Sequence, residues 1–448
     1  MTTTSFKMNR QSIAAYFLTA VLAVAMLSSC QKDEHVPGNN NGNQAQSFSA
    51  DVLDSWMTLQ LRLMRNATGI PNQAFSRHYV YAGVAALESL APGLKGHYNW
   101  SDKWNGLKAT LPVSHPSDKF YYPANVNAAM AAINKAMFPN ASAADKQAID
   151  SLEAAHNGNF ASTIPNDLLV RSANYGKAVA AAVFNWAETD GYKNANNAYT
   201  PPVGAGLWVP TPPASAAAST PYWRNNRTII PGSTYNTRPA APISYSAQPG
   251  SAFYNMVKEV FDASKNLTAD QIAMANFWRD VPGVTTPGHW LSIVQQVIRQ
   301  TNSKLDKAAL AYALTGAAIT DAFISCWDAK YQYNLVRPIT YIRGVMEQPT
   351  WNSHLTTPPH PEYPSAHSSA SAAAAEVLQQ IFGNIGSFTD HTYNYLGYAP
   401  RTFTSFTAIA AEAGKSRLYA GIHYQPSIDA GLVLGKKVTT NIFAKGDN

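Results

Sequence analysis

The chain has 448 residues, 46% of them hydrophobic and only 13% charged, which is typical of folded rather than disordered proteins. Its length is sufficient for one large domain or for two fused ones. The formal net charge of +6 is small, and no run of lysines and arginines occurs, so we expect no nucleic-acid partner.

Residues 1–30 are predicted to be a lipoprotein signal peptide. Lys7 and Arg10 precede an apolar stretch, residues 13–27, that is too short for a comfortable transmembrane helix. It ends in Leu-Ser-Ser-Cys30, which resembles the lipobox of bacterial lipoproteins, whose cysteine is lipidated; an ordinary signal peptide is the alternative. Residues 31–34 resemble an acidic tag for display at the cell surface. We therefore expect export, a lipid on Cys30, and anchoring to the outer membrane.

Residues 31–50 are predicted to form a flexible tether, because they are rich in asparagine, glycine, glutamine and serine. From residue 51 to residue 193, apolar side chains recur at helical spacing, first in Val52, Trp56, Leu59 and Leu63. Clear alternation of apolar and polar residues, which would indicate strands, is scarce. We therefore predict an N-terminal helical half over 51–193.

Residues 194–250 interrupt this pattern, since they hold ten of the chain's 28 prolines and cannot be helical. Their aromatic residues favour a loop packed over the domain surface: Trp208, Tyr222, Trp223 and Tyr235. Helical signals return over 251–448, where Thr268-Ala-Asp-Gln271 is a candidate capping box. We therefore predict an all-α fold of two packed helical bundles, with the loop between an N-terminal and a C-terminal half.

Three segments of the C-terminal half combine cations with histidines. They are Lys330-Tyr-Gln-Tyr-Asn-Leu-Val-Arg337-Pro338, Pro364-Ser-Ala-His367 and Ser416-Arg417-Leu-Tyr-Ala-Gly-Ile-His423. Together they bring three cations, a hydroxyl group and two imidazoles to one part of the chain. These groups are suited to binding a compact tetrahedral oxyanion and to acid–base chemistry on it.

The first segment is predicted to lie at a helix end. Lys330 and Arg337 are seven residues apart, so two helical turns would place them on one face, about 10 Å apart. Because Pro338 disfavours helical geometry at the residue before it, we expect the helix to end at Arg337.

The other two segments are also predicted to lie at helix ends. Ser365 directly precedes an alanine-rich run and is a natural N-cap. The backbone N–H groups of Ala366 and His367 would then face an anion at the positive end of the helix dipole. Arg417 and His423 are expected around the end of an apolar helix, with a glycine that allows the turn between them.

In order and internal spacing, the three segments resemble the signature shared by the vanadium-dependent haloperoxidases and the type 2 phosphatidic-acid phosphatase superfamily, which reads KxxxxxxRP, PSGH and SRxxxxxH. The resemblance is strong over residues 320–431 and looser upstream. It implies vanadate as the cofactor, with phosphate able to occupy the same site.

The resemblance also implies a role for each residue. His423 would bind vanadium through Nε2, or attack phosphorus in a phosphatase, and His367 would be the acid–base group. Asp280 would be a carboxylate that orients an arginine. Lys330 would also polarise the peroxide. The oxygens of vanadate would be held by Lys330, Arg337, Ser365, the N–H of Ala366, and Arg417.

Two positions depart from the family pattern. Ala366 stands where the second segment usually has glycine, and its methyl group would narrow the pocket and disfavour a positive φ. Ser427 stands four residues after His423, where the family tends to place an aspartate that fixes the tautomer of the histidine. The nearest acid is Asp429, so the group that orients His423 stays open.

Two further residues bear on the choice between an oxidant and a phosphatase. Trp327 and His360 occupy positions that line the halide side in haloperoxidases, and a histidine at the latter position resembles bromo- and iodo-type enzymes. The resemblance therefore implies an enzyme that uses hydrogen peroxide to oxidise iodide or bromide to hypohalous acid. The alternatives are an acid phosphatase acting on phosphate monoesters through a phospho-His423, and a non-catalytic surface lipoprotein that binds nutrients.

Overall fold

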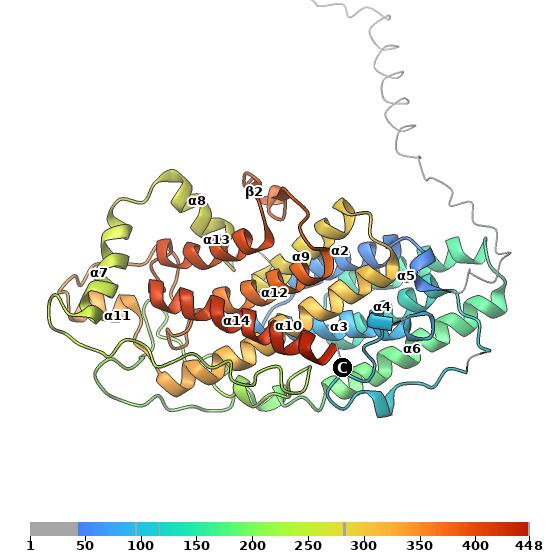
Figure 1. Cartoon of the computed structure of the whole chain (residues 1–448), viewed down its shortest axis with the longest axis horizontal. Coiled ribbons are helices and arrows are strands. Elements are labelled where there is room, and N and C mark those ends of the chain that lie inside the picture. Colours follow the sequence, from blue (N-terminus) through green and yellow to red (C-terminus); the bar gives the residue numbers. More distant parts are fainter. Residues whose placement is uncertain (1–43, 95, 116, 281–283, 447–448) are drawn as a thin grey trace, which may run out of the picture. The chain divides into compact units, whose positions relative to one another are not determined.

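The computed structural model describes residues 44–94, 96–115, 117–280 and 284–446. The predicted signal peptide, Cys30 and most of the predicted tether lie outside these residues. Residues 43–448 form one compact unit, which is mostly helical as predicted (Figure 1). The two short strands, β1 (Phe388–Asp390) and β2 (Arg401–Phe403), pair antiparallel with Thr389 opposite Thr402.

Five α-helices precede the long loop and eight follow it among the described residues. The first group consists of α2 (Asp51–Asn66), α3 (Phe75–Ser89), α4 (Tyr122–Met137), α5 (Ala143–Ala161) and α6 (Asn166–Ala187). The second group consists of α7 (Ala252–Lys265), α8 (Ala269–Phe277), α9 (Thr285–Gln300), α10 (Leu305–Tyr333), α11 (Pro338–Gly344), α12 (Ala366–Phe382), α13 (Phe406–Tyr419) and α14 (Gln425–Gly446). Short 3-10 helices connect them: Ala45–Ser47, Asn72–Ala74, Ala91–Gly93, Gly96–Tyr98, Lys108–Thr110, Tyr192–Asn194, Trp223–Asn225 and Asn394–Leu396.

Helix α10 connects the two groups, because it packs against α3 on one side and against α12 and α14 on the other (Figure 1). The α3–α10 contact is close, since a Cβ atom on Gly83 would lie 2.8 Å from Ala313 Cα, and one on Gly316 would lie 2.7 Å from Val80 Cα. Small residues are therefore required where the two backbones meet. Among the described residues, α10 alone is long and apolar enough to cross a membrane, but its apolar window is fully buried inside the protein.

Residues 194–250 run over the helices as an extended loop, with the 3-10 turn Trp223–Asn225 as its one complete helical element among the described residues. Trp208 and Trp223 are fully buried, whereas Tyr235 is 72% exposed. A carboxylate on α10 holds the loop in place: Asp321 accepts hydrogen bonds from the backbone N–H groups of Ile229 and Ile230 and from Ser233 Oγ. This loop covers one side of α10 as a result.

Two of the C-terminal helices, α8 and α12, begin with the side-chain caps that the sequence predicts. Thr268 and Gln271 form the predicted capping box at the start of α8. Ser365 is the N-cap of α12, and its Oγ accepts a hydrogen bond from Ser368 N. Caps of this kind satisfy N–H groups that have no acceptor within the helix.

The predicted end of the Lys330 helix was wrong. Helix α10 ends at Tyr333, because Asn334 adopts a left-handed conformation with a φ of 47° and terminates it. Arg337 is instead the N-cap of α11, and Pro338 is the first residue of that helix, a position that suits its fixed φ. Lys330 therefore lies in the last turn of α10 and Arg337 directly before α11, rather than on one helix face.

Fully buried His78, on α3, makes the stability of the fold sensitive to acid. Burial lowers its pKa to about 4, whereas the unfolded chain has a histidine pKa near 6.5. Between these values the unfolded state binds a proton that the folded state does not, so the free energy of unfolding falls as the pH drops from about 6.5 to about 4.

We expect His78→Gln to remove about 3 kcal/mol of this acid-induced loss in the free energy of unfolding, as measured by urea unfolding at pH 7 and pH 4. An unchanged pH dependence in the variant would contradict the assignment.

Candidate functional site

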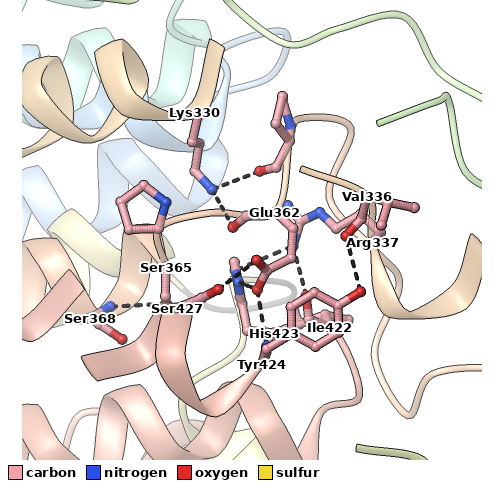
Figure 2. A network of polar contacts seen from close by, with 12 residues as sticks. Lys330, Val336, Arg337, Glu362, Ser365, Ser368, Ile422, His423, Tyr424 and Ser427 are labelled. Atoms are coloured by element: carbon pink, nitrogen blue, oxygen red, sulfur yellow. Dashed lines mark hydrogen bonds and ion pairs between the residues drawn. The ribbon is translucent and has the colours of Figure 1, made fainter. Parts of the chain in front are cut away.

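The three segments meet at a cavity with a volume of about 250 Å³. Seven of the ten predicted site residues line it: Asp280, Trp327, His360, Ala366, His367, Arg417 and His423. The other three are fully buried beside it and join the same polar network: Lys330, Arg337 and Ser365. Figure 2 shows how Lys330, Arg337 and His423 converge from different elements.

His423 lies in the turn between α13 and α14, which Gly421 permits with a φ of 78°. Its Nδ1 lies 2.8 Å from Glu362 Oε1. Burial and nearby cations keep this imidazole neutral, with its pKa well below the usual range, so it carries a single N–H. An ionised carboxylate only accepts, so this N–H is on Nδ1 and donates a hydrogen bond to Glu362 once the carboxyl group, whose pKa burial raises, has lost its proton. Nε2 is then bare, which agrees with the Arg337 Nη1 donor 3.3 Å away. A bare nitrogen is the form that coordinates a metal.

Glu362 is a candidate functional residue that was not predicted from the sequence. Its carboxylate is fully buried and also accepts hydrogen bonds from Tyr424 N and Ser427 Oγ, at 3.0 and 2.6 Å. Asp429, the nearest acid in sequence, is instead exposed and accepts a hydrogen bond from Gln425. The available signal was an acid between a proline and a tyrosine, in Pro361-Glu362-Tyr363, directly before the second segment.

Lys330 and Arg337 are held by backbone carbonyls rather than by ion pairs. Lys330 Nζ donates to Pro361 O and Glu362 O, at 2.8 and 2.9 Å. Arg337 donates from Nε to His360 O and from Nη1 to Ile422 O. Burial lowers the pKa of Lys330 and brings that of Arg337 to about 10. These contacts fix both cations in place beside His423.

Arg417 and the start of α12 supply donors that suit an oxyanion. Arg417 Nη1 donates to Trp278 O at 3.1 Å, while the buried Nε has no hydrogen-bond partner among the described residues. The backbone N–H groups of Ala366 and His367 have no acceptors within their helix, because they belong to its first turn. An unpaired buried donor costs about 1–3 kcal/mol, which an oxyanion ligand would offset.

Ala366 fits this arrangement despite replacing a glycine. It is the first residue of α12 and is not among the described residues with positive φ, so the expected backbone penalty does not arise. Its methyl group lines the cavity, as expected. Behind it, Gly431 on α14 permits close packing, since a Cβ atom there would lie 2.6 Å from Ser365 O.

His367 is oriented by two acceptors on its Nε2. Trp278 O and Thr286 Oγ1 each lie 3.0 Å from this nitrogen. A carbonyl oxygen only accepts, so Nε2 carries the proton and Nδ1 is bare. Nδ1 has no partner among the described residues, and burial lowers the pKa of His367 to about 3. This leaves Nδ1 as the nitrogen that can take up a proton.

Asp280 acts on His367 through Thr286 rather than through an arginine. Thr286 donates to Asp280 Oδ1 from its backbone N at 2.9 Å and from Oγ1 at 3.2 Å. We find no hydrogen bond from an arginine to Asp280 in the described part of the chain; burial lowers the pKa of Arg417 to about 10, and the charge of Asp280 only partly opposes this shift. The carboxylate, the hydroxyl group and the imidazole therefore form a chain of hydrogen bonds.

We expect Thr286→Val to lower kcat about tenfold, which corresponds to 1.36 kcal/mol, because the link between Asp280 and the imidazole is lost. The affinity of the site for an oxyanion should not change, since both donors of Thr286 are used by Asp280. Thr286→Ser keeps the hydroxyl group and is the matched control. Equal losses of kcat in the two variants would contradict a role for the hydroxyl group.

Trp327 and His360 form one wall of the cavity, with their rings 5.0 Å apart and Phe323 beside them. Arg337 Nη2 lies 3.0 Å from His360 Nδ1 and must be the donor, so the proton of this imidazole is on Nε2. Burial lowers the pKa of His360 well below its usual range. The wall is therefore uncharged and largely aromatic, in contrast to the cationic side around Arg417.

Comparisons with known proteins agree with this geometry. Residues 310–447 match the model of a family described as the VCPO second helical-bundle domain. The crystal structure of the first bacterial vanadium-dependent iodoperoxidase is similar, with a TM-score of 0.79 and 32% identity over 92% of this chain and 98% of that chain. No curated protein is a significant match.

A bacterial vanadium-dependent chloroperoxidase shares the fold at 17% identity. Its holo form has a TM-score of 0.64 over 86% of this chain and 94% of its own. Its apo form has a TM-score of 0.62 over 85% of this chain and 96% of its own. The similarity to the iodoperoxidase extends through nearly the whole of both chains, at an identity that indicates common ancestry. The chain therefore belongs to the vanadium-dependent haloperoxidase family.

Proposed function

We propose that this protein is a vanadate-dependent peroxidase that oxidises iodide or bromide with hydrogen peroxide to hypohalous acid. The observation that carries the proposal is the bare Nε2 of His423, which faces a cavity that also receives the unpaired Nε of Arg417 and the start of α12. Membership of the family and similarity to an iodoperoxidase support it.

Different residues of the chain would bind the cofactor and transfer the proton. His423 Nε2 would hold the metal, and Lys330, Arg337 and Arg417 would neutralise the charge of the oxygens. Bound vanadate would supply Lewis-acid activation of peroxide. His367 Nδ1 would accept a proton and return it, because Nε2 is held by Trp278 O and Thr286.

The wall formed by Trp327, His360 and Phe323 favours binding of a large halide ion over a small one. Removing an anion from water costs free energy that rises with the strength of its hydration. Iodide and bromide are more weakly hydrated than chloride, so they enter a cavity lined by Phe323, Trp327 and Pro358 at a lower cost. The expected order of activity is iodide, then bromide, then chloride.

The test uses the purified apo-protein with and without orthovanadate. We expect vanadate to stimulate peroxide-dependent oxidation of iodide and bromide, followed by the formation of triiodide or by bromination of a dye. Hydrolysis of p-nitrophenyl phosphate is measured in parallel, because the same cations could bind a phosphate ester. Phosphate release without any vanadate-stimulated halide oxidation would instead assign the protein to the phosphatases.

We also propose that the enzyme works outside the cell, attached by a lipid on Cys30. Support comes from the residue pattern over 1–30, with its two cations, apolar stretch and lipobox-like end. Metabolic labelling with a fatty acid should mark the wild-type protein and not Cys30→Ser. Labelling of both proteins, or of neither, would contradict the anchor.

A further inference from the structure

The carboxylate of Glu362 contacts the last residue of the third segment, His423, and two residues that follow it, although Glu362 itself precedes the second segment. His423 Nδ1, Tyr424 N and Ser427 Oγ all donate to it, at 2.8, 3.0 and 2.6 Å (Figure 2). The segment that carries it is itself tied down, because Lys330 Nζ donates to Glu362 O at 2.9 Å. Glu362 therefore links the first motif to the third.

Only one carboxylate fits in this place. Ser427 Oγ lies 2.6 Å from Glu362 Oε2, so an aspartate at position 427 would press a second buried negative charge against the first. A serine there instead donates a hydrogen bond and stabilises the charge of Glu362. Each of the two positions could hold the acid, provided that the other position holds a neutral hydrogen-bonding group.

We propose that Glu362 and Ser427 form one unit that sets how strongly His423 binds vanadate, in which the carboxylate is supplied from position 362 and its hydroxyl partner from position 427. The proposal rests on the proposed function, since it concerns the vanadate ligand. The negative charge of Glu362, which accepts the hydrogen bond from Nδ1–H, makes Nε2 a stronger electron-pair donor to a metal, and the hydrogen bond fixes the orientation of the ring.

This role predicts opposite effects on two similar anions. Glu362→Gln keeps an acceptor for Nδ1–H but removes the charge, so Nε2 becomes a weaker ligand. Vanadate affinity should fall about tenfold, as is usual when the partner of a metal-binding histidine is altered. Phosphate forms no bond to Nε2 and is held by the cations alone, so its affinity should be unchanged or higher once a nearby negative charge is gone.

The test measures equilibrium binding of orthovanadate and of inorganic phosphate to four full-length apo-proteins, by dialysis with vanadium or phosphorus analysis. They are the wild type, Glu362→Gln, Ser427→Asp and the double variant. Ser427→Asp should weaken vanadate binding in the wild-type background, because two carboxylates then compete. In the Glu362→Gln background it should strengthen binding to within about threefold of the wild type, since it restores a single charge.

The decisive result is that Ser427→Asp weakens vanadate binding in the wild-type background and strengthens it in the Glu362→Gln background. If Ser427→Asp weakens vanadate binding equally in both backgrounds, the two positions do not share one charge and the proposal fails. Equal losses of vanadate and phosphate affinity in Glu362→Gln would show a structural role only, and this comparison holds even if Ser427→Asp does not fold. A wild-type protein that binds phosphate but not vanadate would instead overturn the proposed function.

Discussion

Replacing His423 with alanine is expected to abolish vanadate binding at micromolar concentrations and to lower halide oxidation at least about a thousandfold, or about 4 kcal/mol. His423 lines the cavity and has a bare, buried Nε2, because its Nδ1 donates to Glu362, and Arg337 Nη1 lies 3.3 Å from Nε2. Without it the cations still attract oxyanions, so phosphate should remain bound. The measurements are equilibrium dialysis with vanadate and with phosphate, and initial rates with iodide.

The matched control is His354→Ala, which removes an exposed histidine outside the cavity and should behave as the wild type. Circular dichroism would establish that both variants are folded. If His423→Ala still bound vanadate as the wild type does, the metal would have to be held by another group, and the assignment of His423 would fail.

Replacing His367 with alanine should have the second-largest effect, but on turnover rather than on binding. Loss of a general acid–base group typically lowers the rate by about 10²–10⁴-fold. The cations, the N-terminus of α12 and His423 all stay in place, so vanadate affinity should change little. The measurement is kcat for iodide at saturating vanadate, together with the dissociation constant of vanadate. Loss of affinity with unchanged kcat would show that His367 binds the anion rather than moving a proton.

The pair of histidine variants therefore separates the two tasks of the site. Both imidazoles are buried, and burial lowers both pKa values, so charge does not distinguish them. Their partners do. His423 has a carboxylate on Nδ1, which leaves Nε2 bare, whereas His367 has a carbonyl and a hydroxyl group on Nε2, which leaves Nδ1 bare.

Features that depend on near neighbours in the chain could be predicted from the sequence. The N-cap at Ser365, the capping box at Thr268 and the glycine turn before His423 each depend on contacts within a few residues. The end of α10 was predicted incorrectly although it is also local. Two helix-ending residues, Asn334 and Pro338, lie close together there, and the helix ends at the first of them.

The sequence by itself determined the cations, the hydroxyl group and the two histidines of the site, and the helix ends that carry most of them, because motif spacing and capping are local properties. Only the tertiary structure decided which partner orients each imidazole. Glu362 is 61 residues from His423, and Thr286 is 81 residues from His367. A hydrogen bond between distant segments depends on how α9, α12 and α14 pack, and no local pattern encodes that distance. The three motifs therefore identify the oxyanion site, whereas helix packing decides which nitrogen of each histidine is free to react.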